Sequence, residues 1–329
     1  MKVLHIIGAD LSKKTIDFAN PKGDHIKVSN DPPGYHQLIG WIRKQKINIA
    51  ETMIVMEHTG LYSYRLERFL RAKKISFSKV PGYVIKHSMG LVRGKNDKVD
   101  AIRIARYGFE KKQSLVAETQ VSESLERLQM LQSTRDHLVR NRAGLIRSVK
   151  EYQDSCGLKK SDLIISSQLE IVKTYDCRIA KLEDAIANIL ESEPTLNKNN
   201  QLLQSVTAVG KVVSLAVIIK TRNFTKFHDA RNFASYCGTA PFDNTSGTSI
   251  RGKTRVSKFR DKNMNRLLDL AAKTAIQYDK ELREFYLRRT AAGKPKMSTI
   301  NVVRCKLLYR MFAVIHRQTP FIKDYLRSA

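Results

Sequence analysis

The segment KVLHIIGAD (Lys2–Asp10) decides the fold class expected for the N-terminal part of the chain. Its apolar residues form a short run that ends in Gly-Ala-Asp, which predicts a buried strand that closes at Asp10. The segments KTIDFAN (14–20) and HIKVSN (25–30) follow with turn residues between them, and they predict two further strands. The chain is therefore expected to begin with a meander of three strands.

The pattern then changes to alternating helices and strands. Residues 34–47 show helical spacing of apolar side chains, TMIVME (52–57) predicts a buried strand that ends at Glu57, and a helix, a strand and another helix follow up to about residue 110. Three antiparallel strands followed by parallel strands with crossover helices is the order of a ribonuclease H-like domain, although many α/β folds share parts of it.

Four carboxylates fall at positions where such a fold collects its functional groups. Asp10 and Glu57 close adjacent parallel strands, and KNDKVDAIRIA (Lys95–Ala105) places Asp97 and Asp100 one helical turn apart. Taken singly, each is typical of a turn, a helix cap or the surface. Together they predict an acidic pocket that divalent cations neutralise, with Mg²⁺ as the expected ion and Mn²⁺ as the alternative. Two such ions would support phosphodiester cleavage.

The charge of the chain points to a polyanionic partner. Among 329 residues, 59 are Lys or Arg and 31 are Asp or Glu, which gives a net charge of +28. Residues 1–110, 111–200 and 201–329 carry net charges of +10, +1 and +17. Nucleic acid is the expected partner, because no basic amphipathic helix with a wide apolar face favours a membrane surface.

Composition also limits the setting of the protein. No apolar run approaches the roughly 18 residues of a membrane span, and the N-terminal apolar segment is too short for a secretory signal. The four cysteines are widely spaced without a C-x-x-C pair, so neither zinc nor a disulfide framework is indicated. We expect a cytoplasmic enzyme.

The middle of the chain predicts long helices. Apolar residues step by three and four along a seam of Val172, Tyr175, Ile179, Leu182, Ile186 and Ile189, and a leucine recurs every seven residues at 131, 138 and 145. A turn near Gly157 separates the two helices, which predicts an antiparallel pair or an oligomeric coiled coil. We therefore expect three domains, at residues 1–115, 116–197 and 198–329.

The last region is mainly helical and strongly basic. QLLQSVTAVGKVVSLAVIIK (201–220) resembles a helix-hairpin-helix element whose second helix, starting at Lys211, offers free N–H groups to phosphate, although an ordinary helical hairpin is nearly as plausible. The polar segment 241–263 predicts a loop or ribbon. Five cations within it are expected to contact nucleic acid together with Lys211: Arg251, Lys253, Arg255, Lys258 and Arg260.

Four segments together resemble a known family. GADLSKK (8–14), MEHTG (56–60), VRGKNDKVDA (92–101) and APFDNTSGTSIRGKTRVSK (240–258) are similar, in order and spacing, to bacterial insertion-sequence transposases related to the pilin-gene invertases. The likeness runs over nearly the whole chain. It implies a RuvC-like domain with Asp10, Glu57, Asp97 and Asp100 as D-E-D-D metal ligands.

The resemblance further implies a C-terminal transposase domain with a nucleophilic serine at Ser246, with Ser249 as the neighbouring alternative. Family members recombine DNA under the guidance of a structured RNA encoded by the element, one part of which pairs with donor DNA and another with target DNA. They resemble tetramers, built from dimers, in which the RuvC-like domain of one subunit meets the serine domain of another.

The residues alone leave the role of Ser246 open. No G-x-S-x-G elbow or fixed histidine spacing accompanies it, so the sequence supplies no hydrolase triad, and without the resemblance the serine is typical of a turn. The expected activity is RNA-guided DNA recombination through a phosphoserine. Two alternatives remain, a metal-dependent RuvC-like junction or structure-specific endonuclease, and a nucleic-acid-binding protein without catalysis. The donor and target sequences, the RNA structure and the DNA end that becomes attached are not encoded in a readable pattern.

Overall fold

The structure is a computed structural model that describes residues 3–58, 60–88, 96–119, 121–246 and 250–323. The side chains of residues 243–254 also lie outside this description. The chain divides into two units, residues 1–120 and 121–329, which are treated separately below.

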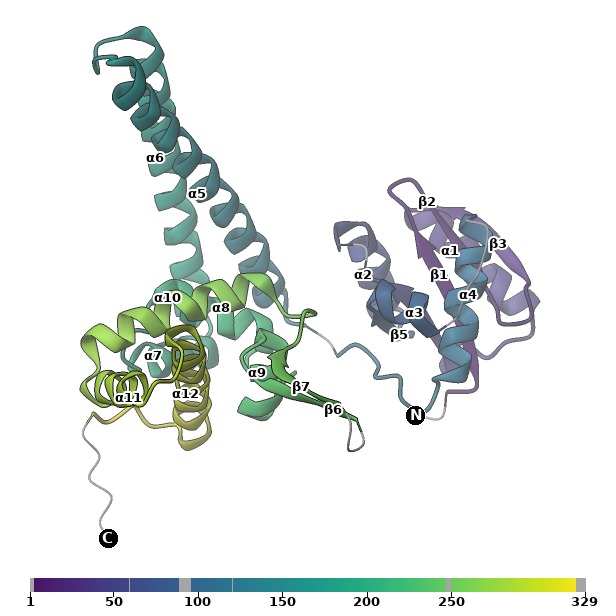
Figure 1. The fold of residues 1–329 in the computed structure, drawn as a ribbon. Helices are drawn as coiled ribbons and strands as arrows, with labels where there is room; N and C mark the ends of the chain where they lie inside the picture. Colours follow the sequence, from purple (N-terminus) through teal and green to yellow (C-terminus); the bar gives the residue numbers. More distant parts are fainter. Residues whose placement is uncertain (1–2, 59, 89–95, 120, 247–249, 324–329) are drawn as a thin grey trace. The chain divides into compact units, whose positions relative to one another are not determined.

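A five-stranded sheet forms the centre of the first unit (Figure 1). The strands are β1 (His5–Leu11), β2 (Thr15–Ala19), β3 (His25–Ser29), β4 (Thr52–Glu57) and β5 (Ser76–Val80), in the spatial order β3-β2-β1-β4-β5. β1, β2 and β3 pair antiparallel, whereas β4 runs parallel to both β1 and β5. This order and these directions are consistent with the ribonuclease H-like fold expected from the sequence.

Helices cover both faces of the sheet. On one face, α1 (Pro32–Lys44) and α2 (Tyr64–Ala72) pack on the odd-numbered residues of β1, Ile7, Ala9 and Leu11. On the other face, α3 (Gly82–Ser88) and α4 (Asp97–Glu110) pack on Ile6 and on residues of β4 and β5. Because side chains alternate along a strand, Asp10 belongs to the face that α4 covers.

Small residues let α4 approach the sheet closely. A Cβ atom at Gly8 would lie 2.3 Å from the carbonyl oxygen of Ala101 and 2.3 Å from the amide nitrogen of Ala105. One turn further along α4, a Cβ at Gly108 would lie 2.8 Å from Cγ2 of Val55. The backbones of β1 and α4 are therefore in direct contact, and this contact fixes the position of the N-terminal turn of α4.

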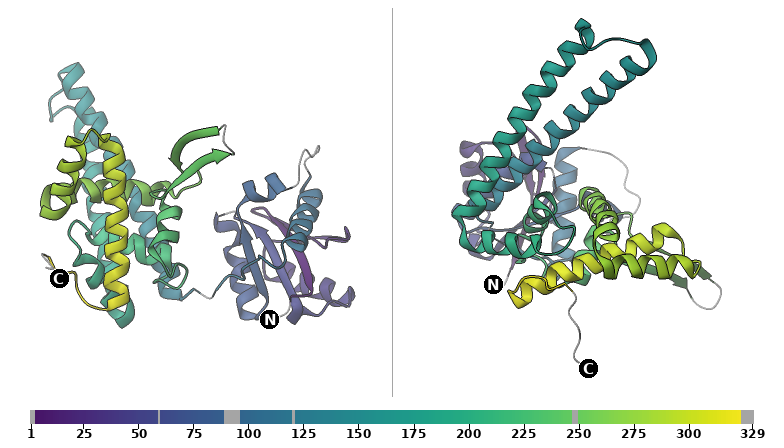
Figure 2. Two further views of the ribbon diagram at one scale, coloured as in Figure 1. Left: turned by 60° about the horizontal axis from the view of Figure 1, so that its bottom comes forward. Right: turned by 90° about the vertical axis from the view of Figure 1, so that its left-hand side faces the viewer.

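The second unit begins with a long helical hairpin. α5 (Glu123–Cys156) and α6 (Leu163–Ser192) lie side by side along their length and extend from the other helices of this unit (Figure 2). Gly157, in a left-handed conformation, ends α5. The expected seam is the contact face: Val172 and Ile186 are buried, and Arg135 pairs with Glu183 across the hairpin at 2.8 Å.

The remaining helices form a core to which the base of the hairpin also contributes. They are α7 (Pro194–Gln204), α8 (Lys211–Thr221), α9 (Ala230–Cys237), α10 (Lys262–Tyr278), α11 (Lys280–Ala291) and α12 (Lys296–Arg317). Leu128 of α5 and Leu190 of α6 share one hydrophobic cluster with α8, α10 and α12. The three domains expected from the sequence stay a prediction, although the hairpin base and the C-terminal helices belong to one unit here.

A two-stranded ribbon lies between α9 and α10. β6 (Pro241–Ser246) pairs antiparallel with β7 (Ile250–Val256), with Ser246 opposite Ile250 and an irregularity between Phe242 and Asn244. The segment for which a loop or ribbon was expected is therefore a ribbon. In the described part of the chain, the helices lack the combination of length and hydrophobicity that a membrane span requires.

Candidate metal centre and nucleic-acid interface

The sheet and α4 bring the predicted carboxylates to one edge of the first unit. Asp10 lies near the end of β1, and Glu57 is the last residue of the neighbouring parallel strand β4. Asp97 and Asp100 occupy the first turn of α4, which packs on the same face of the sheet. The close contact at Gly8, two residues before Asp10, is the reason why this turn lies beside the strand ends.

The helix cap leaves Asp97 available for another role. Asn96 is the N-cap residue, and its side chain accepts a hydrogen bond from the backbone N–H of Lys98 at 3.0 Å. The alternative in which Asp97 itself caps the helix is therefore wrong. Both aspartates lie where the partial positive charge of the helix N-terminus favours ionised carboxylates.

The electrostatics of Asp10 show that the four acids share one environment. Burial raises the pKa of the Asp10 carboxyl to about 6 from 3.8, and the negative charges of Asp100, Asp97, Asp17 and Glu57 raise it further in that order of importance. Like charges have this effect only at short range. Asp10 is thus the centre of an acidic cluster that includes all four predicted residues.

A fifth carboxylate in the cluster was missed by the sequence analysis. Asp17 on β2 lies directly opposite Asp10 on β1 and is buried, with 4% of its surface exposed. Its Oδ1 atom lies 2.6 Å from Nε2 of His25, and its Oδ2 atom lies 3.4 Å from Nζ of Lys27. The signal was present in the sequence, because Asp17 interrupts the apolar strand segment TIDFA, where a buried charge requires a partner.

Cations of the chain partly neutralise the cluster. Nζ of Lys27 lies 3.5 Å from Oδ2 of Asp97, and Nη1 of Arg103 lies 2.7 Å from Oδ1 of Asp100. The charge of Asp17, followed by its hydrogen bond, raises the pKa of Lys27. Two of the four predicted ligands are therefore engaged by side chains of the protein itself.

Glu57 occupies a place that only glycine leaves open. A Cβ atom at Gly82, the first residue of α3, would lie 1.9 Å from Oε1 of Glu57. The carboxylate thus lies against the bare backbone of Gly82 at the end of β4. A side chain at position 82 would require this carboxylate to shift.

The donor set fits a divalent cation in its chemistry. It consists of carboxylate oxygens, which Mg²⁺ and Mn²⁺ prefer, and the mutual repulsion at Asp10 is the cost that a cation relieves. Within the described part of the chain, however, no three His, Cys, Asp or Glu side chains are arranged to hold a metal ion. Two of the predicted ligands are instead ion-paired within the protein, Asp97 with Lys27 and Asp100 with Arg103.

The second candidate region is the ribbon of the second unit. By register Ser246 is the last residue of β6, so it lies at the far end of the ribbon from Pro241. Ser249 lies outside the described residues, as do the side chains of Ser246, Arg251 and Lys253. Arg255, Lys258 and Arg260 follow on β7 and the loop after it, and all three are exposed.

Lys211 begins a helix whose N-terminus is open. α8 is preceded by Gly210, which provides no side-chain cap, and Ala208 before it has a left-handed backbone (φ 71°). Lys211 itself is exposed. This geometry agrees with the expected helical hairpin, and its role in phosphate binding stays a prediction.

Comparisons with known proteins agree with the two regions just described. A model for the DEDD transposase of IS110, described as "Transposase", matches residues 7–155, which contain the acidic cluster. A second model, described as "Transposase IS116/IS110/IS902 family", matches residues 200–287, which contain the ribbon. Both models describe IS110-type transposases, and they match separate parts of this chain.

Proteins similar to this chain include two that are named for DNA inversion and one named as a transposase. The pilin gene-inverting proteins of Moraxella bovis and Moraxella lacunata are each 26% identical over 96% of this chain and 97% of their own length. The transposase for insertion sequence element IS1111A of Coxiella burnetii is 25% identical over 46% of this chain and 47% of its own.

Proposed function

We propose that this protein is a DNA recombinase of the IS110 type that cuts and rejoins DNA strands with both candidate regions. The observation that carries the proposal is the convergence of Asp10, Glu57, Asp97 and Asp100 at one sheet edge, built by the contact of Gly8 with α4. A purely structural role does not account for five carboxylates around one strand end in a chain of net charge +28. The similarity to pilin gene-inverting proteins supports the same activity.

In this proposal, the acids of the first unit, a RuvC-like domain, hold a divalent cation. Asp10, Glu57, Asp97 and Asp100 are the proposed ligands, and Lys27 and Arg103 exchange their present partners when the ion binds. A bound cation supplies Lewis-acid stabilisation of the attacking and leaving oxygens of a phosphodiester. The protein keeps Glu57 against Gly82 and keeps the first turn of α4 against β1.

The ribbon provides the proposed nucleophile. Oγ of Ser246 attacks a DNA phosphorus, the bond to one sugar oxygen breaks, and that oxygen leaves with a proton, so that a phosphoserine joins protein and DNA. Arg251, Lys253, Arg255, Lys258 and Arg260 bind phosphates of the DNA strand that is cut. Lys211 lies at the open N-terminus of α8, in a helix-hairpin-helix-like element. It contacts the DNA backbone away from the cut.

The partners are donor DNA, target DNA and a structured RNA encoded by the element. Base pairing by such an RNA provides sequence recognition that the side chains need not supply. The α5–α6 hairpin is the proposed site of dimerisation, and the dimers assemble to a tetramer. Exposed apolar side chains on the hairpin, Ile146, Leu163, Ile164 and Ile171, support a partner there.

Replacement of the serine tests the chemistry. The protein is incubated with Mg²⁺ and a plasmid that carries its gene with the flanking DNA, and protein–DNA adducts are resolved in denaturing gels. Ser246→Ala should abolish the adduct, whereas Ser235→Ala, on α9, should keep it. The junction endonuclease is the better description if two results are found together: the unmodified protein forms no adduct, and Ser246→Ala cleaves DNA as well as the unmodified protein does.

The RNA partner is tested separately. Nucleic acid that copurifies with the protein is sequenced after nuclease footprinting. A single structured RNA from the DNA next to the gene supports guidance, whereas a random sample of cellular RNA contradicts it.

A further inference from the structure

A cavity lies at the base of the ribbon, at the opposite end of β6 from the proposed nucleophile. It has a volume of about 580 Å³ and is bounded by the ribbon, the end of α9, the start of α10 and α12. Pro241 and Val256, which pair with each other at the base of the ribbon, form part of its wall. We call it the ribbon-base cavity.

The charged residues that line the ribbon-base cavity are cationic. Arg260 and Arg304 both line it, and no Asp or Glu is among its lining residues. Arg304 is held by an ion pair of its Nη2 with Oδ1 of Asp269 and is 8% exposed, while its buried Nε has no hydrogen-bond partner within the described residues. A fixed guanidinium with an unused donor is suited to an anion.

The other lining groups suit a flat ring. Val256, Met297 and Val302 supply apolar surface, and the side-chain amides of Asn265 and Asn301 lie beside it. Both amide nitrogens already donate to backbone carbonyls, Asn301 to Thr239 at 2.7 Å and Asn265 to Cys237 at 3.0 Å. The amides are therefore held in one orientation, which positions their oxygens as acceptors.

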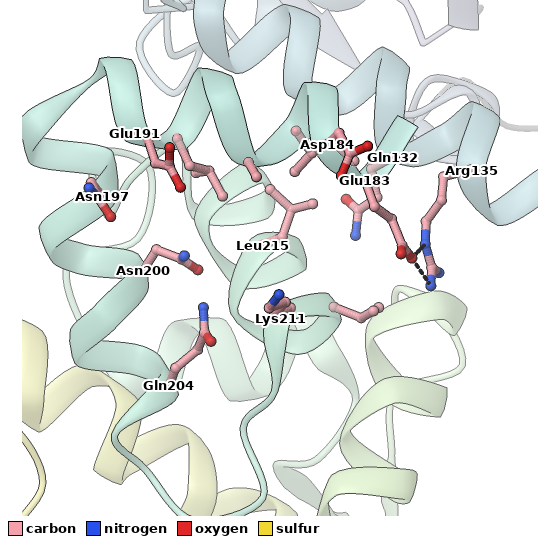
Figure 3. A pocket seen from close by; sticks show the side chains of 14 residues that line it. Gln132, Arg135, Glu183, Asp184, Glu191, Asn197, Asn200, Gln204, Lys211 and Leu215 are labelled. Atoms are coloured by element: carbon pink, nitrogen blue, oxygen red, sulfur yellow. Dashed lines mark hydrogen bonds and ion pairs between the residues drawn. The ribbon is translucent and has the colours of Figure 1, made fainter. Parts of the chain in front are cut away.

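A second cavity of the same unit shows the contrast. It lies between α5, α6, α7 and α8, has a volume of about 450 Å³, and is lined by three carboxylates, Glu183, Asp184 and Glu191, against two cations, Arg135 and Lys211 (Figure 3). In Figure 3 Arg135 is already engaged with Glu183. The charged lining of this second cavity is mostly acidic, whereas that of the ribbon-base cavity consists of two arginines, of which Arg304 has its ion-pair partner, Asp269, outside the lining.

We propose that the ribbon-base cavity binds one nucleotide of the DNA strand that is cut. Its phosphate lies at Arg260 and Arg304, and its base lies against Val256, Met297 and Val302. The proposal rests on the proposed function. Five residue steps separate Pro241 from Ser246, about 17 Å of strand, so the bound nucleotide is about five stacked nucleotides from the cut.

Mononucleotides are the probes, because a single nucleotide cannot make the many phosphate contacts on which non-specific DNA binding depends. Binding of dAMP and dTMP to the full-length protein is measured by saturation-transfer NMR and calorimetry, with deoxyadenosine and inorganic phosphate as comparisons. We expect saturable binding of the nucleotides. Their affinity should be at least about tenfold higher than that of deoxyadenosine or phosphate alone, because a nucleotide makes both the base and the phosphate contacts and tenfold corresponds to about 1.4 kcal/mol.

Variants at the rim locate the site without disturbing the core. Met297 is 59% exposed, so Met297→Glu places a negative charge at the mouth and should weaken nucleotide binding about tenfold or more. Met297→Leu should bind normally. Tyr309→Glu, with the same charge about 18 Å along α12 on an exposed residue, is the matched charge control and should also bind normally.

Three results would overturn the proposal. Phosphate that binds as tightly as dAMP indicates an anion site only, equal loss in Met297→Glu and Tyr309→Glu indicates general charge, and no saturable binding indicates no site. The serine adduct assay separates this proposal from the proposed function. An adduct without nucleotide binding contradicts only the cavity, and nucleotide binding without an adduct contradicts only the role of Ser246.

Discussion

The acidic edge of the first unit and the ribbon of the second unit are constructed differently. The acids stand on strands and a helix that are packed from both faces, and the contact of Gly8 with Ala101 and Ala105 sets their spacing. In the described part of the ribbon, β6 and β7 pair only with each other. Two-stranded ribbons have little stability of their own. The acidic site is therefore supported by a packed sheet, whereas the two strands of the ribbon have only each other as hydrogen-bonded neighbours in the described residues.

The largest expected effect on stability comes from overpacking the contact between β1 and α4 that supports the acidic edge. Gly8→Ala forces β1 and α4 apart, because its Cβ would lie 2.3 Å from two backbone atoms of α4. We expect the free energy of unfolding of the first unit to fall by about 3 kcal/mol or more, measured by urea denaturation.

Gly40→Ala is the matched control for this substitution. Gly40 lies inside α1, and a Cβ there meets nothing within 4 Å. Because alanine is the better helix former, this variant should be more stable by about 0.5–1 kcal/mol. Equal destabilisation by both substitutions would contradict the role assigned to the contact at Gly8.

A smaller effect of opposite sign follows from the charge of the cluster. Without divalent ions, Asp10→Asn replaces a carboxylate whose ionisation is disfavoured by burial and by the neighbouring negative charges, and it should raise the urea midpoint at pH 7.5. The folded pKa of Asp10 is raised to about 6 from 3.8, so ionisation costs stability as the pH rises from about 4 to 6. The advantage of the variant should be complete above pH 6 and shrink as the pH falls to 5. An advantage that is constant with pH would contradict the raised pKa of Asp10.

The smallest effect on stability is expected at the ribbon. Arg255→Gln and Lys258→Gln replace exposed residues and should change the free energy of unfolding by less than about 0.5 kcal/mol. Each should nevertheless reduce the slope of log affinity for DNA against log salt by about 1. Anisotropy titrations of labelled DNA at several salt concentrations measure the slope, and an unchanged slope would exclude a phosphate contact.

The sequence was most informative where one face of an element is buried. Short apolar segments predicted the strands, and the positions of Asp10 and Glu57 at strand ends predicted the acidic edge, because functional groups collect at the carboxyl ends of adjacent parallel strands. The partners Lys27 and Arg103 were not predicted, since an ion pair depends on side-chain reach across β3 and within α4. The ribbon-base cavity joins residues more than 60 positions apart, such as Thr239 and Asn301, and no local pattern encodes it.

Divalent-cation binding tests the central claim, that the acids form one site, most directly. Mg²⁺ or Mn²⁺ is titrated by calorimetry into the full-length protein freed of nucleic acid at pH 7.5. The account predicts saturable binding that weakens at least about tenfold in Asp10→Asn and in Glu57→Gln. Asp154 is an exposed carboxylate of α5, and Asp154→Asn should leave the binding unchanged. Binding that is absent, or equal in all four proteins, would contradict it.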